Sequence, residues 1–333
     1  MTSSLTRSAQ FLPPQRPPAA WVAEKLAVLP VSSALCLFTG WGAEARALRQ
    51  LGWSIATADL LPSSVWWNEA FIGEETLPLS DRQVNEWLKL CKEPEIVKRF
   101  MSWANRYVTA EEAIWLGIWH HHLVEGDWPR PARALGIVTV YWVLRYWLQL
   151  NRQDLGFKPM PPSMAFRHYV AQANQLLNMR LGASHGVGRL APDLALSKYP
   201  ADLLYCYVPA LEGIETPGSV EQLLEQWTQG STIATPSPFP VGTLGGVFAH
   251  PDDHLNAVAR LLAAADALPY VALTYHGSIG PALEALLEQR RPLIAHEEWR
   301  APYPSTEGSS IIVQGILIAG SFERGATDEG ISE

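Results

Sequence analysis

Residues 34–60, ALCLFTGWGAEARALRQLGWSIATADL, contain the pattern that decides the fold. An apolar run that ends at Phe38 is followed by a Thr-Gly-Trp-Gly turn at residues 39–42. An amphipathic segment comes next, and a second apolar run ends at Asp59. Two apolar strands joined by a glycine turn and an amphipathic helix make a βαβ unit. The stretch therefore predicts an α/β protein.

The turn of this unit has the features of a nucleoside-binding site. Gly40 and Gly42 allow a sharp turn and a close approach of the backbone to a ligand, beside the unpaired N–H groups of a helix start. Asp59 lies 17 residues after Gly42, at the end of the second strand, where an acidic residue suits a ribose hydroxyl pair. A short Gly-x-Gly turn between a strand and a helix also occurs with no ligand, so both interpretations stay open at this point.

The composition is that of a globular protein. With 333 residues, of which 48% are hydrophobic, the chain can bury a large core as one domain with an insertion or as two domains. Cys36, Cys91 and Cys206 have no C-x-x-C spacing and are odd in number, which predicts reduced core thiols in a cytoplasmic protein. No apolar run reaches the ~18 residues of a membrane span, and no signal-peptide pattern is present. We expect a soluble, cytoplasmic protein with no membrane partner.

The formal net charge of −8 is unevenly distributed. Residues 196–333 contain six Lys/Arg and 17 Asp/Glu, whereas residues 1–195 contain 19 Lys/Arg and 16 Asp/Glu. Contacts with phosphates are therefore expected in the first two-thirds of the chain.

The order of segments predicts the domain organisation. Residues 1–20 are rich in Pro, Ser and Gln and read as a flexible tail, and residues 325–333 as an acidic tail. Residues 21–60 and 196–324 alternate strand and helix patterns and form the predicted α/β core. Residues 61–195 have helical periods and many tryptophans, which predicts an all-helical insertion. Its expected helices are Val84–Phe100, Ala110–Val124, Ala132–Leu150 and Pro162–Met179.

Aromatic residues and histidines of the insertion are interpreted as structural. We expect a core role for Trp66, Trp67, Trp87, Trp103, Trp115, Trp119, Trp128, Trp142 and Trp147. Consecutive helical residues point in different directions, so the run His120–His122 is not expected to share a metal ion. The metal-capable segment His250–His254 is read as a helix start with acidic caps. We therefore predict no metal site.

Strand patterns return after residue 195. The expected strands are Ala201–Val208, Tyr270–Tyr275, Ile294–Trp299 and Ser310–Ala319, and the expected helices are Val220–Thr228, His254–Ala267 and Pro281–Gln289. This alternation predicts one doubly wound sheet, in which ligands bind beyond the carboxyl ends of the strands. The stretches Thr39–Gly42, Asp59, Tyr207–Ala210 and Tyr275–Ser278 are then expected at one site.

The order of these motifs resembles the D12-class, Dam-type adenine-specific DNA methyltransferases. Phe38-Thr39-Gly40-Trp41-Gly42 matches the Phe-x-Gly-x-Gly turn that in the family holds S-adenosylmethionine, and Ala58-Asp59 matches its ribose-binding acidic position. Asp253-His254, Thr274-Tyr275 through Gly280 and Ile311–Ala319 resemble later elements of the family. The resemblance implies a Rossmann-like methyltransferase sheet with a DNA-recognition insertion. It also implies cofactor binding by Phe38, Gly40, Gly42 and Asp59.

The chain departs from the family where the chemistry occurs. Tyr207-Val208-Pro209-Ala210 stands where the catalytic Asp-Pro-Pro-Tyr belongs, so only the second proline is kept. In the family the aspartate and a nearby backbone carbonyl accept the hydrogens of the adenine amine, and the final aromatic residue stacks on the flipped base. Tyrosine is neutral near pH 7 and cannot replace the carboxylate, and Ala210 offers no stacking face. Tyr207 and Pro209 therefore occupy positions of the family's catalytic motif, but this chain lacks the catalytic carboxylate and the stacking aromatic ring of that motif.

A second departure lies near the N-terminus. The family's Gly-Lys turn, which helps to close the cofactor pocket, corresponds here to the proline-rich residues 12–18, with Arg16 as the one cation.

Three interpretations follow. The first is a catalytically impaired methyltransferase homologue that keeps a role in binding cofactor, DNA or a protein partner. The second is an active enzyme with a rebuilt site, in which Glu212, Asp202 or Glu215 serves the target amine; Asp202 begins a strand and is expected to point away, which favours Glu212. The third is a structural or assembly subunit with a vestigial cofactor turn and an aromatic protein interface.

DNA contacts are expected from the insertion if DNA is bound. The candidate cations are Arg130, Arg133, Arg145, Arg152 and Lys158. Acidic residues are interspersed among them, so an ordinary solvated face is an equally open interpretation.

Overall fold

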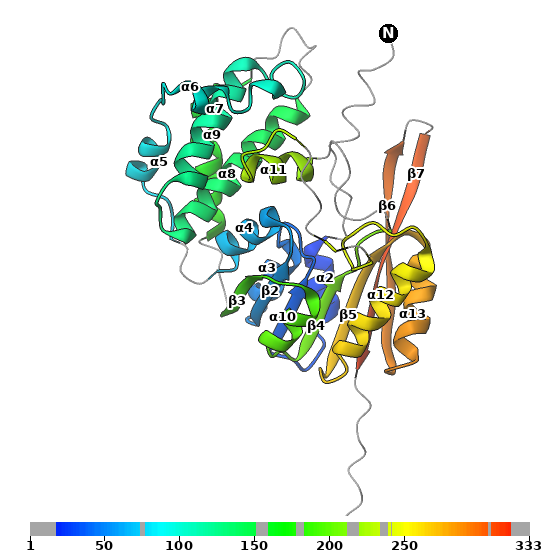
Figure 1. Cartoon of the computed structure of the whole chain (residues 1–333). Helices are drawn as coiled ribbons and strands as arrows, with labels where there is room; N and C mark the ends of the chain where they lie inside the picture. Colours follow the sequence, from blue (N-terminus) through cyan, green and yellow to red (C-terminus); the bar gives the residue numbers. More distant parts are fainter. Residues whose placement is uncertain are drawn as a thin grey trace, which may run out of the picture.

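The chain forms a seven-stranded sheet with a separate cluster of helices (Figure 1). The computed structural model describes residues 18–73, 77–150, 159–177, 183–211, 220–233, 239–240, 242–305 and 308–320. The strands are β1 (Ser33–Leu37), β2 (Ser54–Asp59), β3 (Ser184–Arg189), β4 (Leu203–Tyr207), β5 (Tyr270–His276), β6 (Leu293–Ser305) and β7 (Gly308–Gly320). Their order across the sheet is β3-β2-β1-β4-β5-β7-β6.

One strand of the sheet runs against the others. Strands β1 to β5 pair in parallel, whereas β7 pairs antiparallel with both β5 and β6. The strand order changes direction between β1 and β4, which are adjacent and parallel: β2 and β3 follow on one side, and β5, β7 and β6 on the other. This is a doubly wound, Rossmann-like sheet, so the predicted α/β fold class is confirmed.

Helices cover both faces of the sheet, as the doubly wound prediction requires. Helices α2 (Ala19–Leu26) and α3 (Ala43–Gln50) share an apolar core with alternate residues of β1, β2, β4, β5 and β7. Helices α10 (Pro192–Lys198), α12 (Pro251–Ala264) and α13 (Gly280–Glu288) form a second core with the intervening strand residues. A strand whose two faces are both covered must be apolar throughout, which explains the unbroken run Leu203–Tyr207.

The remaining helices form what we call the helical unit. It consists of α4 (Pro62–Phe71), α5 (Asp81–Trp87), α6 (Pro94–Lys98), α7 (Ala110–Trp119), a π-helix (His120–Glu125), α8 (Arg130–Gln149), α9 (Pro162–Leu177) and α11 (Val220–Thr228). Short 3₁₀ turns cover Met101–Trp103 and Gly277–Ile279. Capping boxes begin α5 at Ser80 and α7 at Thr109. Figure 1 shows the unit beside the sheet, with α4 nearest to it.

Tryptophans fill the helical unit, as predicted. Trp67, Trp87, Trp103, Trp119 and Trp147 are buried in its core, and Trp66, Trp115, Trp128 and Trp142 are partly buried against it. Trp119 stacks on Trp147 with ring centroids 5.8 Å apart, and Trp227 of α11 donates its indole N–H to the Leu116 carbonyl.

The predicted division of the chain needs two corrections. Residues 61–195 are not all helical, because they contain β3, which extends the sheet beside β2. This strand was not predicted because Gly186 and Gly188 interrupt its apolar pattern. The Tyr199 side chain lies 3.1 and 2.9 Å from where the Cβ atoms of these two glycines would be. Helix α11, which was assigned to the α/β core, buries Leu223 and Trp227 in the helical unit.

The cysteines are reduced, and one of them is not a core thiol. Cys36 and Cys206 are buried in β1 and β4, whereas Cys91 lies partly exposed in the loop between α5 and α6. None of the helices in the described part of the chain combines the length and apolar character that a bilayer crossing requires. The predicted tails at residues 1–20 and 325–333 lie outside the described residues, apart from residues 18–20.

Candidate functional site

The candidate site lies at the carboxyl ends of β1, β2 and β4, where the sheet faces α4. Phe38, Asp59 and Val208 directly follow or end these three neighbouring strands and are buried. The glycine turn leads from β1 into α3, and Asp59 leads from β2 into α4. This edge is where open α/β sheets bind their ligands.

The glycine turn has an unusual backbone. Phe38, Gly40 and Gly42 all adopt left-handed conformations, with φ values of 54°, 55° and 67°. Gly42 closes the turn by donating its N–H to the Thr39 carbonyl at 3.0 Å. A left-handed phenylalanine costs roughly 1–2 kcal/mol, a strain typical of functional sites.

Packing against α4 explains why position 42 is glycine. A Cβ on Gly42 would lie 2.6 Å from the Asn68 Oδ1. Asn68 is held in place, because its amide donates to the Thr39 hydroxyl at 3.2 Å and to the Ser64 carbonyl at 2.8 Å. Asn68 therefore fixes the turn and the start of the helical unit to each other. This residue was not predicted to belong to the site.

The tryptophan of the turn packs on the helical unit. Trp41 stacks on Trp67 of α4, with ring centroids 5.3 Å apart and an angle of 10° between the rings. The Arg145 guanidinium of α8 lies 4.6 Å from the centroid of the Trp41 ring. Arg145, predicted as a DNA contact, thus also holds the turn to the helical unit.

Two acidic residues lie at this edge. Asp59 is 3% exposed, and its Oδ1 accepts the Leu61 N–H at 2.9 Å, just before the first turn of α4. Glu44, in the first turn of α3, is also buried. The pKa of the Cys36 thiol at the end of β1 is raised by burial and then by the Glu44 charge, so this charge acts at the strand end. Two buried acidic side chains therefore lie at the ends of these strands.

The residues present fit part of S-adenosylmethionine. Helix α3 begins at Gly42 with no side-chain cap, so its first N–H groups are not taken by a capping side chain. Asp59 carries the type of group that binds ribose hydroxyls, and Phe38 packs against Phe239 with ring centroids 6.1 Å apart. Phe38, Gly40, Gly42 and Asp59 thus gather at one edge, as predicted, and their role in cofactor binding stays a prediction.

The end of β4 has no carboxylate. Residues 203–211 contain no Asp or Glu; Tyr207 and Val208 are buried, and the Val208 N–H donates to the Thr274 carbonyl of β5 at 2.8 Å. The Pro209 carbonyl oxygen lies 2.9 Å from the Nε2 of His254, which is 1% exposed. The Pro209 carbonyl, which is the first backbone acceptor after Tyr207 and Val208, therefore already accepts a hydrogen bond from the buried His254 imidazole.

Of the three alternative acids, Asp202 lies among the described residues. Asp202 lies at the amino end of β4, where its Oδ2 accepts the N–H groups of Ser32 and Ser33, both at 3.0 Å. It therefore points away from the site, as predicted. Glu212 and Glu215 lie outside the described residues, as do Arg16, Arg152 and Lys158.

The helix start at Pro251 differs from the prediction of an aspartate cap. His250 is the N-cap residue of α12 and makes no side-chain cap hydrogen bond, whereas Asp252 and Asp253 lie in the first turn and favour the helix dipole. His254, which is two residues beyond Asp252, faces the Pro209 carbonyl.

The sequence also missed a chain of polar groups at the end of β5. The Tyr275 hydroxyl lies 2.7 Å from the His296 Nε2, and the His296 Nδ1 lies 3.0 Å from Glu284 Oε2. The hydroxyl occupies the space above Gly280 and Gly315, where a Cβ would collide with it. Burial raises the pKa of Tyr275, so the chain holds a neutral phenol. The glycines were visible in the sequence, but their common partner was not.

Two of the predicted DNA-contacting arginines lie beside Trp66. The guanidinium groups of Arg130 and Arg133 lie 5.5 and 5.1 Å from the centroid of the Trp66 ring. The Nε of Arg130 also lies 3.4 Å from Glu69.

Comparisons with known proteins add only distant similarities. No family model and no curated protein matches the chain. Among solved structures, a putative RNA methyltransferase, PH1948 from Pyrococcus horikoshii, is 7% identical with a TM-score of 0.33, covering 92% of this chain and 81% of that chain. The hMettl16 catalytic domain in complex with the MAT2A 3′UTR hairpin 6 is 11% identical with a TM-score of 0.34, covering 95% and 74%. Scores this low carry no inference about function.

Proposed function

We propose that this chain is a methyltransferase-fold protein that binds S-adenosylmethionine at the ends of β1 and β2 and does not methylate adenine. The observation that carries the proposal is the contrast between two neighbouring strand ends. β2 ends in the buried carboxylate of Asp59, beside a strained glycine turn, whereas β4 ends in Tyr207-Val208-Pro209-Ala210 with the Pro209 carbonyl facing His254.

The loss at β4 concerns the group that makes adenine reactive. S-adenosylmethionine supplies an electrophilic methyl group when bound, but the adenine amine is a poor nucleophile until acceptors take up its protons. The Tyr207 hydroxyl is neutral, and the Pro209 carbonyl already has a donor in His254. Each acid–base element of this kind contributes about 10²–10⁴ in rate, so losing the carboxylate and the stacking residue together removes several powers of ten.

The cofactor half has kept features that packing alone does not require. The docking of α4 explains Gly42, but it does not explain the left-handed Phe38 or the two carboxylates, Glu44 and Asp59, buried at the same edge. Strain and buried charge both reduce stability unless they are compensated. Both features lie at the strand ends where a cationic nucleoside ligand would bind, and this placement supports the proposal.

The proposed partner is duplex DNA, bound by the helical unit. Trp66 with Arg130 and Arg133 offers an aromatic face and two cations of the kind that contact nucleic acids, and the Arg130 side chain is 56% exposed. We expect salt-sensitive binding of labelled duplex DNA by the wild type. The Arg130→Ala/Arg133→Ala variant should bind several-fold more weakly, whereas Arg290→Ala, which alters an arginine paired with Asp266 on the core, should not.

Cofactor binding is tested by calorimetry on a matched pair of variants. Asp59→Asn keeps an oxygen for the Leu61 N–H but removes the charge, so S-adenosylmethionine affinity should fall about 10- to 100-fold, the worth of hydrogen bonds to a charged group. Asp202→Asn makes the same change at the opposite edge and should leave affinity unchanged. Equal effects in both variants, or no binding by the wild type, would contradict the proposal.

Methyl transfer is tested with the same proteins. The wild type should transfer no label from S-adenosylmethionine to adenine-containing duplexes. Tyr207→Asp/Val208→Pro/Ala210→Tyr, which restores the family motif, is the comparison. Robust transfer by the wild type would favour the rebuilt site, and a Glu212→Gln variant would then show whether Glu212 serves it.

A structural or assembly role is the second candidate. It is favoured by the packing of Trp41, which lies against Trp67 and Arg145 of the helical unit. In that case the turn docks the helical unit and binds no ligand. The absence of both calorimetric heat and thermal stabilisation at millimolar S-adenosylmethionine would support this alternative.

A further inference from the structure

The helical unit brings a cysteine and two histidines together, far from the glycine turn in the sequence. Cys91, in the loop between α5 and α6, places its Sγ 3.6 Å from the Nε2 of His122 in the π-helix. His121 is the neighbour of His122, and their ring centroids are 5.3 Å apart. One donor atom from each of the three residues lies within 4.8 Å of the other two, and all three residues are partly exposed.

These spacings approach those of a metal site. A tetrahedral Zn²⁺ ion with bonds of about 2.0–2.3 Å holds its donor atoms roughly 3.3–3.8 Å apart. The separation between the Cys91 Sγ and the His122 Nε2 already falls in this range, and the remaining separations between donor atoms are no more than 4.8 Å. A thiolate with two imidazoles is a donor set that suits Zn²⁺ and similar transition metals.

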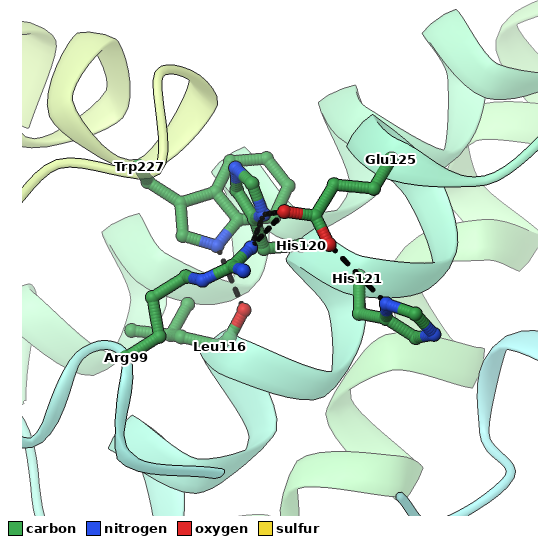
Figure 2. Close-up of polar contacts among 6 residues, drawn as sticks. All are labelled: Arg99, Leu116, His120, His121, Glu125 and Trp227. Carbon is green, nitrogen blue, oxygen red and sulfur yellow. Dashed lines mark hydrogen bonds and ion pairs between the residues drawn. The ribbon is translucent and has the colours of Figure 1, made fainter. Parts of the chain in front are cut away.

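The structure removes the reason for which the sequence argued against a metal here. The sequence showed three consecutive histidines in an expected α-helix, whose side chains would point in different directions, and no further donor was considered. His120–Glu125 forms a π-helix, a rare conformation that is frequent at functional sites, and the third donor comes from a separate loop. His120 takes no part, because it is buried against Trp227 and contacts Arg99 (Figure 2).

Neighbouring groups orient one of the histidines as they do in metal proteins. The Nδ1 of His121 lies 3.2 Å from the Glu125 carboxylate, and Arg99 holds this carboxylate from the other side (Figure 2). A carboxylate that accepts from Nδ1 leaves the lone pair on Nε2, the arrangement found behind metal-bound histidines. The Nε2 of His122 lies 3.0 Å from the Lys89 carbonyl, a contact that metal binding would replace.

We propose that Cys91, His121 and His122 bind one Zn²⁺-type ion reversibly, with the fourth position open to water. Binding ties the loop between α5 and α6 to the π-helix. The negative thiolate and the Glu125 carboxylate behind His121 offset the charge of the ion. This site is independent of the proposed cofactor site.

Cobalt titration of the full chain tests the proposal. We expect one Co²⁺ per chain, with the visible bands of a four-coordinate ion and a near-ultraviolet band from sulfur-to-cobalt charge transfer, both displaced by Zn²⁺. Cys91→Ser should abolish the sulfur band, and His121→Asn or His122→Asn should weaken binding by at least about 100-fold. His168→Asn, which alters a histidine of α9 that pairs with Gln172, should bind like the wild type.

Thiol chemistry gives a second readout. Cys36 and Cys206 are fully buried, so a thiol reagent should modify Cys91 first in the folded protein. Zn²⁺ should slow this modification at least 10-fold in the wild type and in His168→Asn, but not in His122→Asn. A missing sulfur band, or equal cobalt binding by the wild type and Cys91→Ser, would overturn the proposal.

Discussion

Substitution of Gly42 by alanine measures how strongly the glycine turn is fixed to the helical unit. The substitution has two costs. The φ of 67° is unfavourable for alanine by roughly 1–2 kcal/mol, and the new methyl group meets Asn68 Oδ1 at 2.6 Å, an overpacking that costs about 1–3 kcal/mol. We expect Gly42→Ala to lower the free energy of unfolding by about 2–5 kcal/mol in total.

A matched control separates the two costs. Gly52 has a φ of 89° with no atom within 4 Å of the position of a Cβ, so Gly52→Ala has only the backbone cost. In an Asn68→Ala background the collision is gone, and Gly42→Ala should then cost no more than Gly52→Ala. The double-mutant cycle should therefore give a coupling energy of about 1–3 kcal/mol. Urea unfolding followed by far-ultraviolet circular dichroism provides the measurement. If Gly42→Ala and Gly52→Ala lower the free energy of unfolding equally, or if Gly42→Ala and Asn68→Ala are additive, a Cβ at position 42 does not collide with Asn68.

Two further predictions concern packing and pH. A Cβ on Gly117 of α7 would overlap the Ile96 backbone carbonyl, so Gly117→Ala should destabilise the chain to urea by about 2 kcal/mol despite a helix-propensity gain of roughly 1 kcal/mol; a stabilised variant would contradict the close contact of α6 and α7. The Ser32 N–H and the Ser33 hydroxyl lower the pKa of Asp202, so its contribution is present above about pH 4 and is lost as the pH falls through the folded-state pKa. Asp202→Asn should be less stable than the wild type by about 1 kcal/mol at pH 7 and equal to it at low pH; a difference that grows on acidification would show the opposite sign.

The sequence allowed the sheet to be predicted where burial on both faces makes strands apolar. Leu203–Tyr207 and Tyr270–Tyr275 are such runs, and the glycine turn marked the first crossover. Strand β3 was not predicted, because an edge strand that contains Gly186 and Gly188 has no continuous apolar pattern. The position of α11 was predicted wrongly for another reason. Its amphipathic pattern shows that one face is buried, but it does not show which of the cores covers that face.

The candidate site shows the same division. The residues of the turn and Asp59 were visible as a local motif, because adjacent parallel strands bring their carboxyl ends together. The contacts of Asn68, His254 and His296 were not, since each residue contacts a segment distant in sequence: Asn68 the turn, His254 Pro209 and His296 Tyr275. The π-helix was equally hidden, because nothing in residues 120–125 distinguishes it from a continued α-helix.

The fate of the methyl group of S-adenosylmethionine tests whether the chain binds the cofactor without methylating adenine. The wild-type chain is incubated with methyl-labelled S-adenosylmethionine and an adenine-containing duplex, and label is followed in both the protein and the DNA. We expect saturable label on the wild-type protein and on Asp202→Asn, loss of this label in Asp59→Asn, and no label in the DNA. Label that accumulates in the DNA, or a protein that retains none, would contradict this expectation.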